Sequence, residues 1–188
     1  MNEDSLRTKM VVAAHTAGEP ARLMAGTLII GYGNTLRSDD ALGWRAAEQI
    51  AASHTGGNIE VQLHHQLGPE LAEPLSEVDL AIFIDAGCQG TPGQVSCQRV
   101  EPSDASSGFT HHFHPGVLLT MAKHLFGRCP RTFIISVVGE SFACGETLSP
   151  AVQRALPAVQ KLVADLLAGR KTALPNAGEN CPNEDSTR

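Results

Sequence analysis

Three short apolar segments, separated by segments with helical periodicity, constrain the fold of this chain more than any other feature. They span residues 27–32, 79–84 and 132–138, and each has the length of one buried strand. Strands that are apolar along their whole length are typical of a largely parallel sheet that is covered on both faces. The sequence therefore predicts an α/β fold: a three-layer α/β/α sandwich with a mostly parallel sheet of about five strands.

The remaining strands and the helices follow from weaker patterns. Two further strands are expected over Asn58–Leu63 and Gln94–Val100, the second at an edge of the sheet. Apolar residues spaced by three and four predict helices over 41–53, 69–75 and 115–126, and a long one from Ser149-Pro150 to about 166. Asp40 is expected to cap the first helix, and Pro157 is expected to kink or divide the last.

The length and composition favour one folded domain. A chain of 188 residues can bury a sizeable core, and we expect that domain over 25–168, with a flexible leader over 1–24 and a disordered tail over 169–188. The net charge of −6 and the lack of a basic stripe argue against nucleic-acid binding. The apolar runs are far shorter than the ~20 residues that cross a membrane, so we expect no membrane contact.

The cysteines are scattered, and their number is odd. They stand at Cys88, Cys97, Cys129, Cys144 and Cys181, with no C-x-x-C pair. A disulfide framework is uncommon in a chain of this size, so we expect a cytoplasmic protein with reduced thiols. Cys88 follows the second apolar strand, and we interpret it as a small buried residue.

A glycine-rich turn follows the first apolar strand and leads to two adjacent acids. The turn starts at Gly31-Tyr32-Gly33-Asn34 and ends in Asp39-Asp40. Leu36 stands where a dinucleotide-binding turn has its third glycine, and there is no Gly-Lys-Ser/Thr for a phosphate loop. Two carboxylates at the start of a helix repel phosphate and suit a cation, although a single acid there is often only a helix cap.

Two further places carry reactive side chains at the expected edge of the sheet. Asp85 follows the second buried strand, where it could also cap a turn, and His111, His112 and His114 lie in a loop that leads into a helix. The carboxyl ends of central parallel strands meet at one edge, so these groups can converge with Asp40. Two carboxylates and an imidazole suit a borderline metal such as nickel or zinc and leave a position open for substrate or water.

These residues resemble a known family in their type, order and context. The resemblance runs from Gly31-x-Gly33-Asn34-x-Leu36-x-x-Asp39-Asp40-x-x-Gly43, through the strand that ends in Asp85-Ala86, to Thr110-His111-His112-x-x-Pro115. Gln66–Ala72 and Gly139–Phe142 add to it, and it covers roughly residues 26–168. The pattern is similar to that of the nickel-iron hydrogenase maturation endopeptidases.

The resemblance implies an aspartyl protease-like hydrolase that removes a short C-terminal peptide from the nickel-loaded precursor of a hydrogenase large subunit. It implies a metal-dependent peptide hydrolase in which Asp40, Asp85 and His111 contact the metal and act in catalysis, with His112 the alternative histidine. Nickel is expected to be presented by the substrate rather than bound permanently. This chain has Asp40 where the family has glutamate, which demands a closer approach of the metal. A monomer suffices for this role.

Two other functions fit the same residues. A non-catalytic protein that checks for nickel in the precursor would use the same three ligands. A nucleotide- or phosphate-binding α/β enzyme would use Gly31–Asn34 as its loop, but the acidic pair argues against it. The residues do not decide which group serves as general base.

Overall fold

The computed structural model describes residues 26–53, 58–103 and 113–169. The expected leader over 1–24 and all but the first residue of the expected tail lie outside them. The elements are β1 (Thr27–Tyr32), η1 (Ser38–Ala41), α1 (Leu42–Ser53), β2 (Ile59–His64), η2 (Pro69–Leu71), α2 (Ala72–Ser76), β3 (Leu80–Gly87), β4 (Val95–Val100), α3 (Pro115–Phe126), β5 (Arg131–Val138) and α4 (Pro150–Leu167).

The strands form one five-stranded sheet in the order β2-β1-β3-β5-β4. β1 pairs in parallel with both β2 and β3, and β3 pairs in parallel with β5. β4 lies at the edge and runs antiparallel to β5. The predicted α/β fold with a mostly parallel sheet is confirmed, as is the edge position of the strand near residue 95. Across the described part of the chain, no helix is long and apolar enough to cross a membrane.

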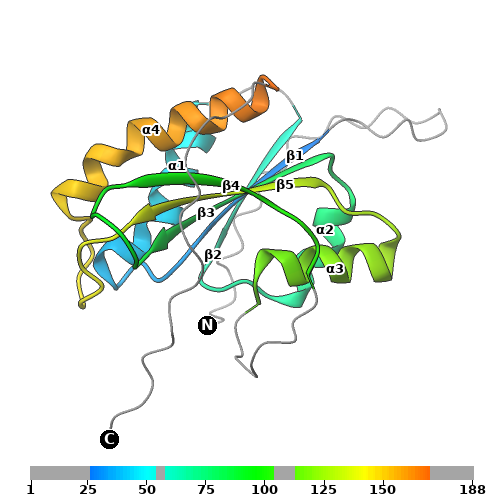
Figure 1. The fold of residues 1–188 in the computed structure, drawn as a ribbon, viewed down its shortest axis with the longest axis horizontal. Coiled ribbons are helices and arrows are strands. Elements are labelled where there is room, and N and C mark those ends of the chain that lie inside the picture. The colour runs from blue at the N-terminus through cyan, green and yellow to red at the C-terminus, as the bar shows by residue number, and fades with distance from the viewer. Residues whose placement is uncertain (1–25, 54–57, 104–112, 170–188) are drawn as a thin grey trace, which may run out of the picture.

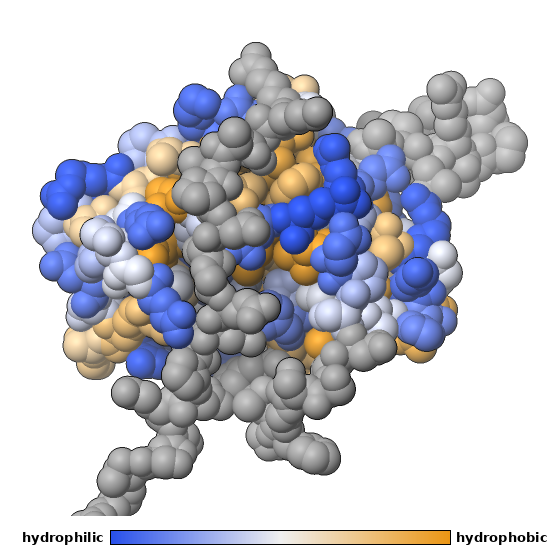
Figure 2. Space-filling view, in the orientation of Figure 1, coloured by the Kyte–Doolittle hydropathy of each residue, from blue (hydrophilic) through white to orange (hydrophobic). Residues whose placement is uncertain are grey.

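Helices cover both faces of the sheet, which makes three layers (Figure 1). α1 and α4 pack on one face, where Ile29, Ile82 and Ile135 are fully buried. α2 and α3 pack on the other face, over Ile30 and Phe83. Each strand thus contributes alternate residues to two apolar cores, which is why β1 and β3 are apolar along their whole length. On the side of the molecule that the space-filling view shows, hydrophilic residues occupy much of the periphery, and apolar residues lie toward the middle (Figure 2).

Two glycines let α1 contact the sheet through its backbone. A β-carbon at Gly43 would collide with the carbonyl oxygens of Tyr32 and Ile84, and one at Gly31 would collide with the carbonyl oxygen of Gly43. The start of α1 therefore lies directly against β1 and β3, closer than any side chain would permit. This contact fixes the helix that follows the acidic pair.

The structure overturns one local expectation and one of the two alternatives in another. Asp40 does not cap a helix, because a 3-10 turn, η1, precedes α1 without a break and its first turn has no side-chain cap. Pro157 does not divide the last helix in two, since α4 runs continuously from Pro150 to Leu167, and the alternative, a kink, stays a prediction. The stripe of buried residues on both sides of the proline, including Val152, Val159 and Val163, packs on the sheet and stabilises the helix despite the lost hydrogen bond.

Replacing Pro157 by alanine is expected to stabilise the protein. The proline is exposed and lies inside α4, so its ring removes one backbone hydrogen bond without contributing to the core. Alanine restores that bond, and we expect a gain of about 1–3 kcal/mol in the free energy of unfolding. Urea unfolding followed by the fluorescence of Trp44, the single tryptophan, measures it. A loss of stability would show that the proline supports the helix.

The cysteine expectations hold only in part. Cys97, Cys129 and Cys144 are free thiols. Cys88, which was expected to be small, buried and reduced, is instead exposed just beyond β3 and is disulfide-bonded. The interpretation was wrong because β3 ends at Gly87, so the next residue already lies outside the sheet.

Candidate active site

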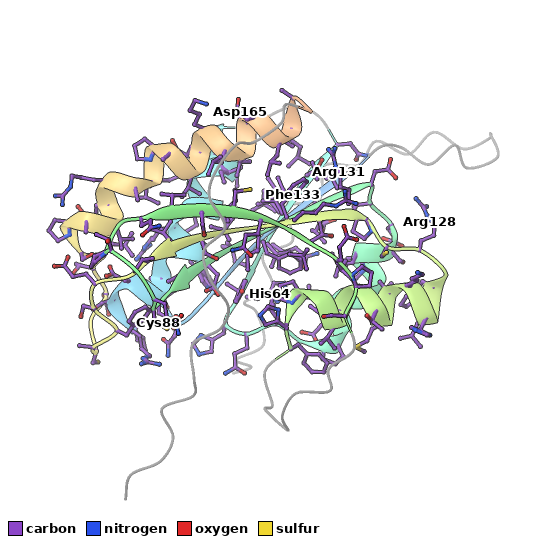
Figure 3. The ribbon with its side chains drawn as sticks, in the orientation of Figure 1. His64, Cys88, Arg128, Arg131, Phe133 and Asp165 are labelled. Carbon is purple, nitrogen blue, oxygen red and sulfur yellow. The ribbon has the colours of Figure 1, made fainter. Side chains whose placement is uncertain are left out.

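The carboxyl ends of β1, β2 and β3 lie together at one edge of the sheet. In the register of the strands, Gly31 is opposite Ile84, and Tyr32 is opposite His64. The residues at this end of β1 and of the two strands beside it are therefore neighbours in space, although they come from segments far apart in the chain. His64 at the end of β2 and Cys88 just beyond β3 both lie in the lower half of the view in Figure 3, which locates this edge.

A cleft opens at this edge and contains both predicted carboxylates. Its lining includes two acids, two imidazoles and one guanidinium: Tyr32, Gly33, Asn34, Arg37, Asp40, His65, Gln66, Leu67, Asp85, Ala86, Phe113, His114 and Pro115. Another hollow lies between α1 and α4, and it is lined by Arg45, Gln49, Thr147, Leu148, Gln153 and Leu156. That second lining offers neither a carboxylate nor an imidazole, so the chemistry points to the cleft at the strand ends.

Asp40 is held at the wall of the cleft by the glycine-rich turn. Its Oδ2 accepts a hydrogen bond from the backbone N–H of Asn34 at 2.9 Å. The turn is closed by a second bond, from the N–H of Leu36 to Oδ1 of Asn34 at 2.9 Å. Gly33 has a φ of 136°, a conformation that side chains rarely adopt, and its α-carbon lies against the carbonyl of Asp40. The glycine thus permits the turn to fold back onto the acid.

Asp39 points away from Asp40 and is fully buried. Its Oδ2 accepts the backbone N–H groups of Glu140 at 2.7 Å and Ser141 at 2.9 Å, and its Oδ1 accepts the N–H of Ser149 at 2.6 Å. The carboxylate therefore holds together both ends of the loop between β5 and α4. The two adjacent acids have different roles: one fixes the loop, and the other faces the cleft.

The surroundings of Asp39 favour its charged form. Burial alone raises the pKa of a carboxyl, but here the N–H groups of Ser149, Ser141 and Glu140 stabilise the carboxylate and hold its pKa below the usual value. Hydrogen bonds to a charged acceptor are among the stronger ones in proteins. The loop is thus held by a buried charge that stays ionised at neutral pH.

Asp85 lies at the floor of the cleft in a different environment. Its Oδ1 accepts the N–H of Ala86 at 2.7 Å, and its carboxylate is hydrogen-bonded to the side chain of Tyr32. Burial raises the pKa of Asp85 to about 7, a rise that these two hydrogen bonds oppose and the negative charge of Asp40 reinforces. At neutral pH this carboxyl exchanges its proton readily, as a group in an acid–base site must.

The structure brings together two of the three predicted site residues. Asp40 and Asp85 line the same cleft. His111 and the alternative His112 lie outside the described residues, so their place in the site stays a prediction. His114, from the same predicted loop, does line the cleft. Within residues 26–53, 58–103 and 113–169, no three His, Cys, Asp or Glu side chains are grouped so that they could hold a metal ion.

Two residues of the cleft were not expected from the sequence. His65, which no sequence motif singled out, follows β2 and lines the cleft with an exposed side chain. Tyr32 was expected to end a buried strand and to begin the glycine-rich turn, with no part in the site, yet it contacts Asp85. No local sequence pattern marked them. Because β1 lies between β2 and β3, Tyr32 at its end is a neighbour of residues on both strands, and that strand order is known only from the structure.

Several solved structures of similar fold are named hydrogenase maturation endopeptidases, peptidases or proteases. The hydrogenase maturating endopeptidase HybD from E. coli has a TM-score of 0.61 and 25% sequence identity, over 77% of this chain and 93% of that one. The maturation protease HycI from Thermococcus kodakarensis has a TM-score of 0.62 and 21% identity, over 77% and 94% of the two chains. A hydrogenase 2 maturation peptidase from a Thaumarchaeota archaeon has a TM-score of 0.57 and 24% identity, over 76% and 97%. No protein-family model and no curated protein sequence matches the chain.

The fold and the cleft define an α/β protein with two carboxylates at the carboxyl ends of its central strands. The likeness to the E. coli endopeptidase covers nearly all of that protein. The resemblance of this chain to the nickel-iron hydrogenase maturation endopeptidases, which the sequence motifs indicated, is therefore confirmed.

Proposed function

We propose that this protein is the endopeptidase that removes a short C-terminal peptide from the nickel-loaded precursor of a hydrogenase large subunit. The observation that carries the proposal is the presence of Asp40 and Asp85 in one open cleft at the ends of β1 and β3. The solved endopeptidases and proteases of similar fold support the reaction class. The cytoplasmic location and the monomeric state stay predictions.

The donor set of the cleft suits the cargo of such a precursor. Carboxylate oxygens and imidazole nitrogens are ligands that nickel accepts. Asp40, Asp85 and the predicted His111 would contact a metal ion that the precursor itself carries. This contact would hold the adjoining C-terminal segment of the precursor in the cleft, and holding the reacting groups in place supplies much of the lowering of the barrier.

Cleavage then requires an activated water molecule and a group that accepts its proton. A carboxylate within hydrogen-bond reach of the water can accept that proton, and a metal ion next to the peptide carbonyl polarises it. Asp40 and Asp85 are the two carboxylates that line the cleft. The peptide nitrogen that leaves must in turn receive a proton, and the group that accepted a proton from the water can deliver it.

The direct test is cleavage of the precursor by the purified protein. We expect catalytic amounts of the enzyme to shorten the nickel-loaded precursor at a single position, and to leave the nickel-free precursor uncut. Intact-mass spectrometry before and after incubation shows the mass of the released peptide. Binding of the nickel-loaded precursor without any shortening would instead support the non-catalytic checkpoint protein. Neither binding nor cleavage would contradict the proposed function.

A further inference from the structure

We propose that Tyr32 is a positioning residue of this site, which fixes the carboxylate of Asp85 in the orientation that the reaction needs. The proposal rests on the proposed function and adds a residue to it. Tyr32 lies in the glycine-rich turn motif, between Gly31 and Gly33, yet nothing in its type or spacing marks it as part of the chemistry.

The strand register places Tyr32 beside Asp85. Gly31 is opposite Ile84 in the parallel pair of β1 and β3, so the next residues of the two strands are neighbours. Residues that alternate along a strand share one face, and Ile30 and Phe83 pack together in the core under α2 and α3. Tyr32 and Asp85, two positions further along, therefore stand on that same face, and both line the cleft.

The ring of Tyr32 has little freedom to move. It packs against the apolar core under α2 and α3 and meets the buried ring of Phe83 edge-on, with 6.4 Å between the ring centres and 81° between their planes. Its side chain is hydrogen-bonded to that of Asp85. Since an ionised carboxylate can only accept, the phenol O–H donates this bond. A fixed ring thus presents a donor at a fixed place.

The carboxylate of Asp85 would be poorly oriented without that donor. The terminal torsion of aspartate has a broad, roughly two-fold profile, so the group rotates easily unless hydrogen bonds hold it. The N–H of Ala86, in the next peptide unit, supplies one bond to Oδ1 at 2.7 Å. Tyr32 supplies the second bond, from the neighbouring strand. Removing a donor that orients a metal-binding or reacting group in this way lowers metal affinity or activity by about 10- to 100-fold.

The first experiment compares processing by the wild-type protein, Tyr32→Phe and a matched control, Ser96→Ala. Tyr32→Phe removes only the hydroxyl and keeps the ring. Ser96 lies on the same face of the sheet, two strands from β3, and its hydroxyl donates to the carbonyl of Ser136 at 3.4 Å. With nickel-loaded precursor, we expect Tyr32→Phe to lower kcat by about 10- to 100-fold with KM within about twofold, because the rest of the cleft still binds the precursor. Ser96→Ala should keep kcat within about twofold of the wild type.

The second experiment needs no substitution at position 32. Tyr32 is the single tyrosine of the chain, so growth on 3-fluorotyrosine places one fluorine label there. We expect one fluorine NMR signal that shifts clearly when Asp85 is replaced by asparagine and stays in place for Asp79→Asn, a variant at the opposite edge of the sheet. A fluorine chemical shift that is the same in the wild type and in Asp85→Asn would show that the two side chains do not interact.

The outcomes separate this inference from the proposed function. If the wild-type protein does not cut the precursor, the proposed function fails, while the NMR comparison still tests the contact between Tyr32 and Asp85. If the wild-type protein cuts and Tyr32→Phe cuts at the same rate, the proposed function stands and the role of Tyr32 is refuted. Equal losses for Tyr32→Phe and Ser96→Ala would also refute it, because a hydroxyl remote from Asp85 would then matter as much.

Discussion

Replacing Asp85 by asparagine is expected to abolish processing of the precursor while making the folded protein more stable at neutral pH. The amide keeps the shape of the side chain and can still accept the N–H of Ala86, but it cannot bind a metal as an anion or carry a proton. We expect the variant to have no detectable activity and a higher free energy of unfolding. This combination is typical of a residue that is needed for function although it destabilises the folded protein. Mass spectrometry of the precursor and urea unfolding measure the two effects.

The stability gain has a defined dependence on pH. The carboxyl of Asp85 has a pKa of about 7 in the folded protein and a value near 3.9 when unfolded, so ionising it favours the unfolded state. Wild-type stability is therefore highest, relative to Asp85→Asn, below about pH 4, and it falls as the pH rises toward 7. The pKa shift limits the stability difference between Asp85→Asn and the wild type to about 4 kcal/mol, and contact of the carboxyl with water in the cleft reduces this difference. We therefore expect Asp85→Asn to be more stable than the wild type by about 2 kcal/mol above pH 7.

Asp79→Asn is the matched control for both effects. Asp79 precedes β3 at the opposite edge of the sheet, where its exposed carboxylate pairs with Arg128 at 3.3 Å. The same chemical change there should leave processing intact and alter stability by less than about 1 kcal/mol. If Asp85→Asn still processed the precursor at the wild-type rate, Asp85 would have no part in the reaction. If its stability relative to the wild type did not change between pH 4 and 8, the assigned environment of Asp85 would be wrong.

Replacing Asp39 by asparagine is expected to cause the largest loss of stability. In the folded protein Oδ2 of Asp39 accepts the N–H groups of Glu140 and Ser141, and Oδ1 accepts that of Ser149. The amide of an asparagine has one oxygen and one NH₂ group. Its oxygen can accept hydrogen bonds on one side, but its NH₂ group would face a backbone N–H on the other side, where no hydrogen bond can form. With about 1.5–3 kcal/mol for each bond to a buried charge, we expect a loss of about 4 kcal/mol in the free energy of unfolding. Urea unfolding at pH 7, followed by Trp44 fluorescence, measures it.

The effect of Asp39→Asn should shrink in acid. The folded-state pKa of Asp39 lies below its unfolded value, so the stabilisation is fully present above about pH 4 and is lost as the pH falls through the folded-state pKa. The free energies of unfolding of the wild type and Asp39→Asn should therefore become similar at low pH. Asp85→Asn differs in sign: it is more stable than the wild type at neutral pH, and this advantage disappears as the pH falls to about 4. A loss below about 1 kcal/mol at pH 7 would mean that the loop between β5 and α4 does not depend on this carboxylate.

The fold and half of the site chemistry could be predicted from local patterns. β1 and β3 carry buried apolar residues at successive positions because both faces of the sheet are covered, and α3 starts at Pro115 and ends at Phe126 as expected. The placement of Asp40 and Asp85 in one cleft follows from a general property of parallel sheets, whose strand ends meet at one edge. This property needs no knowledge of side-chain contacts.

The roles of neighbouring residues could not be predicted, because they depend on which way each side chain turns. Asp39 and Asp40 are equivalent in sequence, but the 3-10 turn η1 points one into the core and the other into the cleft. The partners of Asp39 lie about 100 positions away in the chain, so no local pattern reveals them. Tyr32 is joined to Asp85 only through the register of two strands, which the sequence does not state.

The contact of α1 with the sheet at Gly31 and Gly43 bears on which ions the cleft can accept. With backbone against backbone, the start of α1 cannot slide over β1 and β3, and Asp40 lies only three residues before Gly43. Asp85 belongs to β3 itself. The gap between the two carboxylates is therefore set by a rigid frame rather than adjusted by whatever occupies it. We expect the cleft to discriminate by ionic radius, so that a precursor loaded with a larger divalent ion would dock out of register.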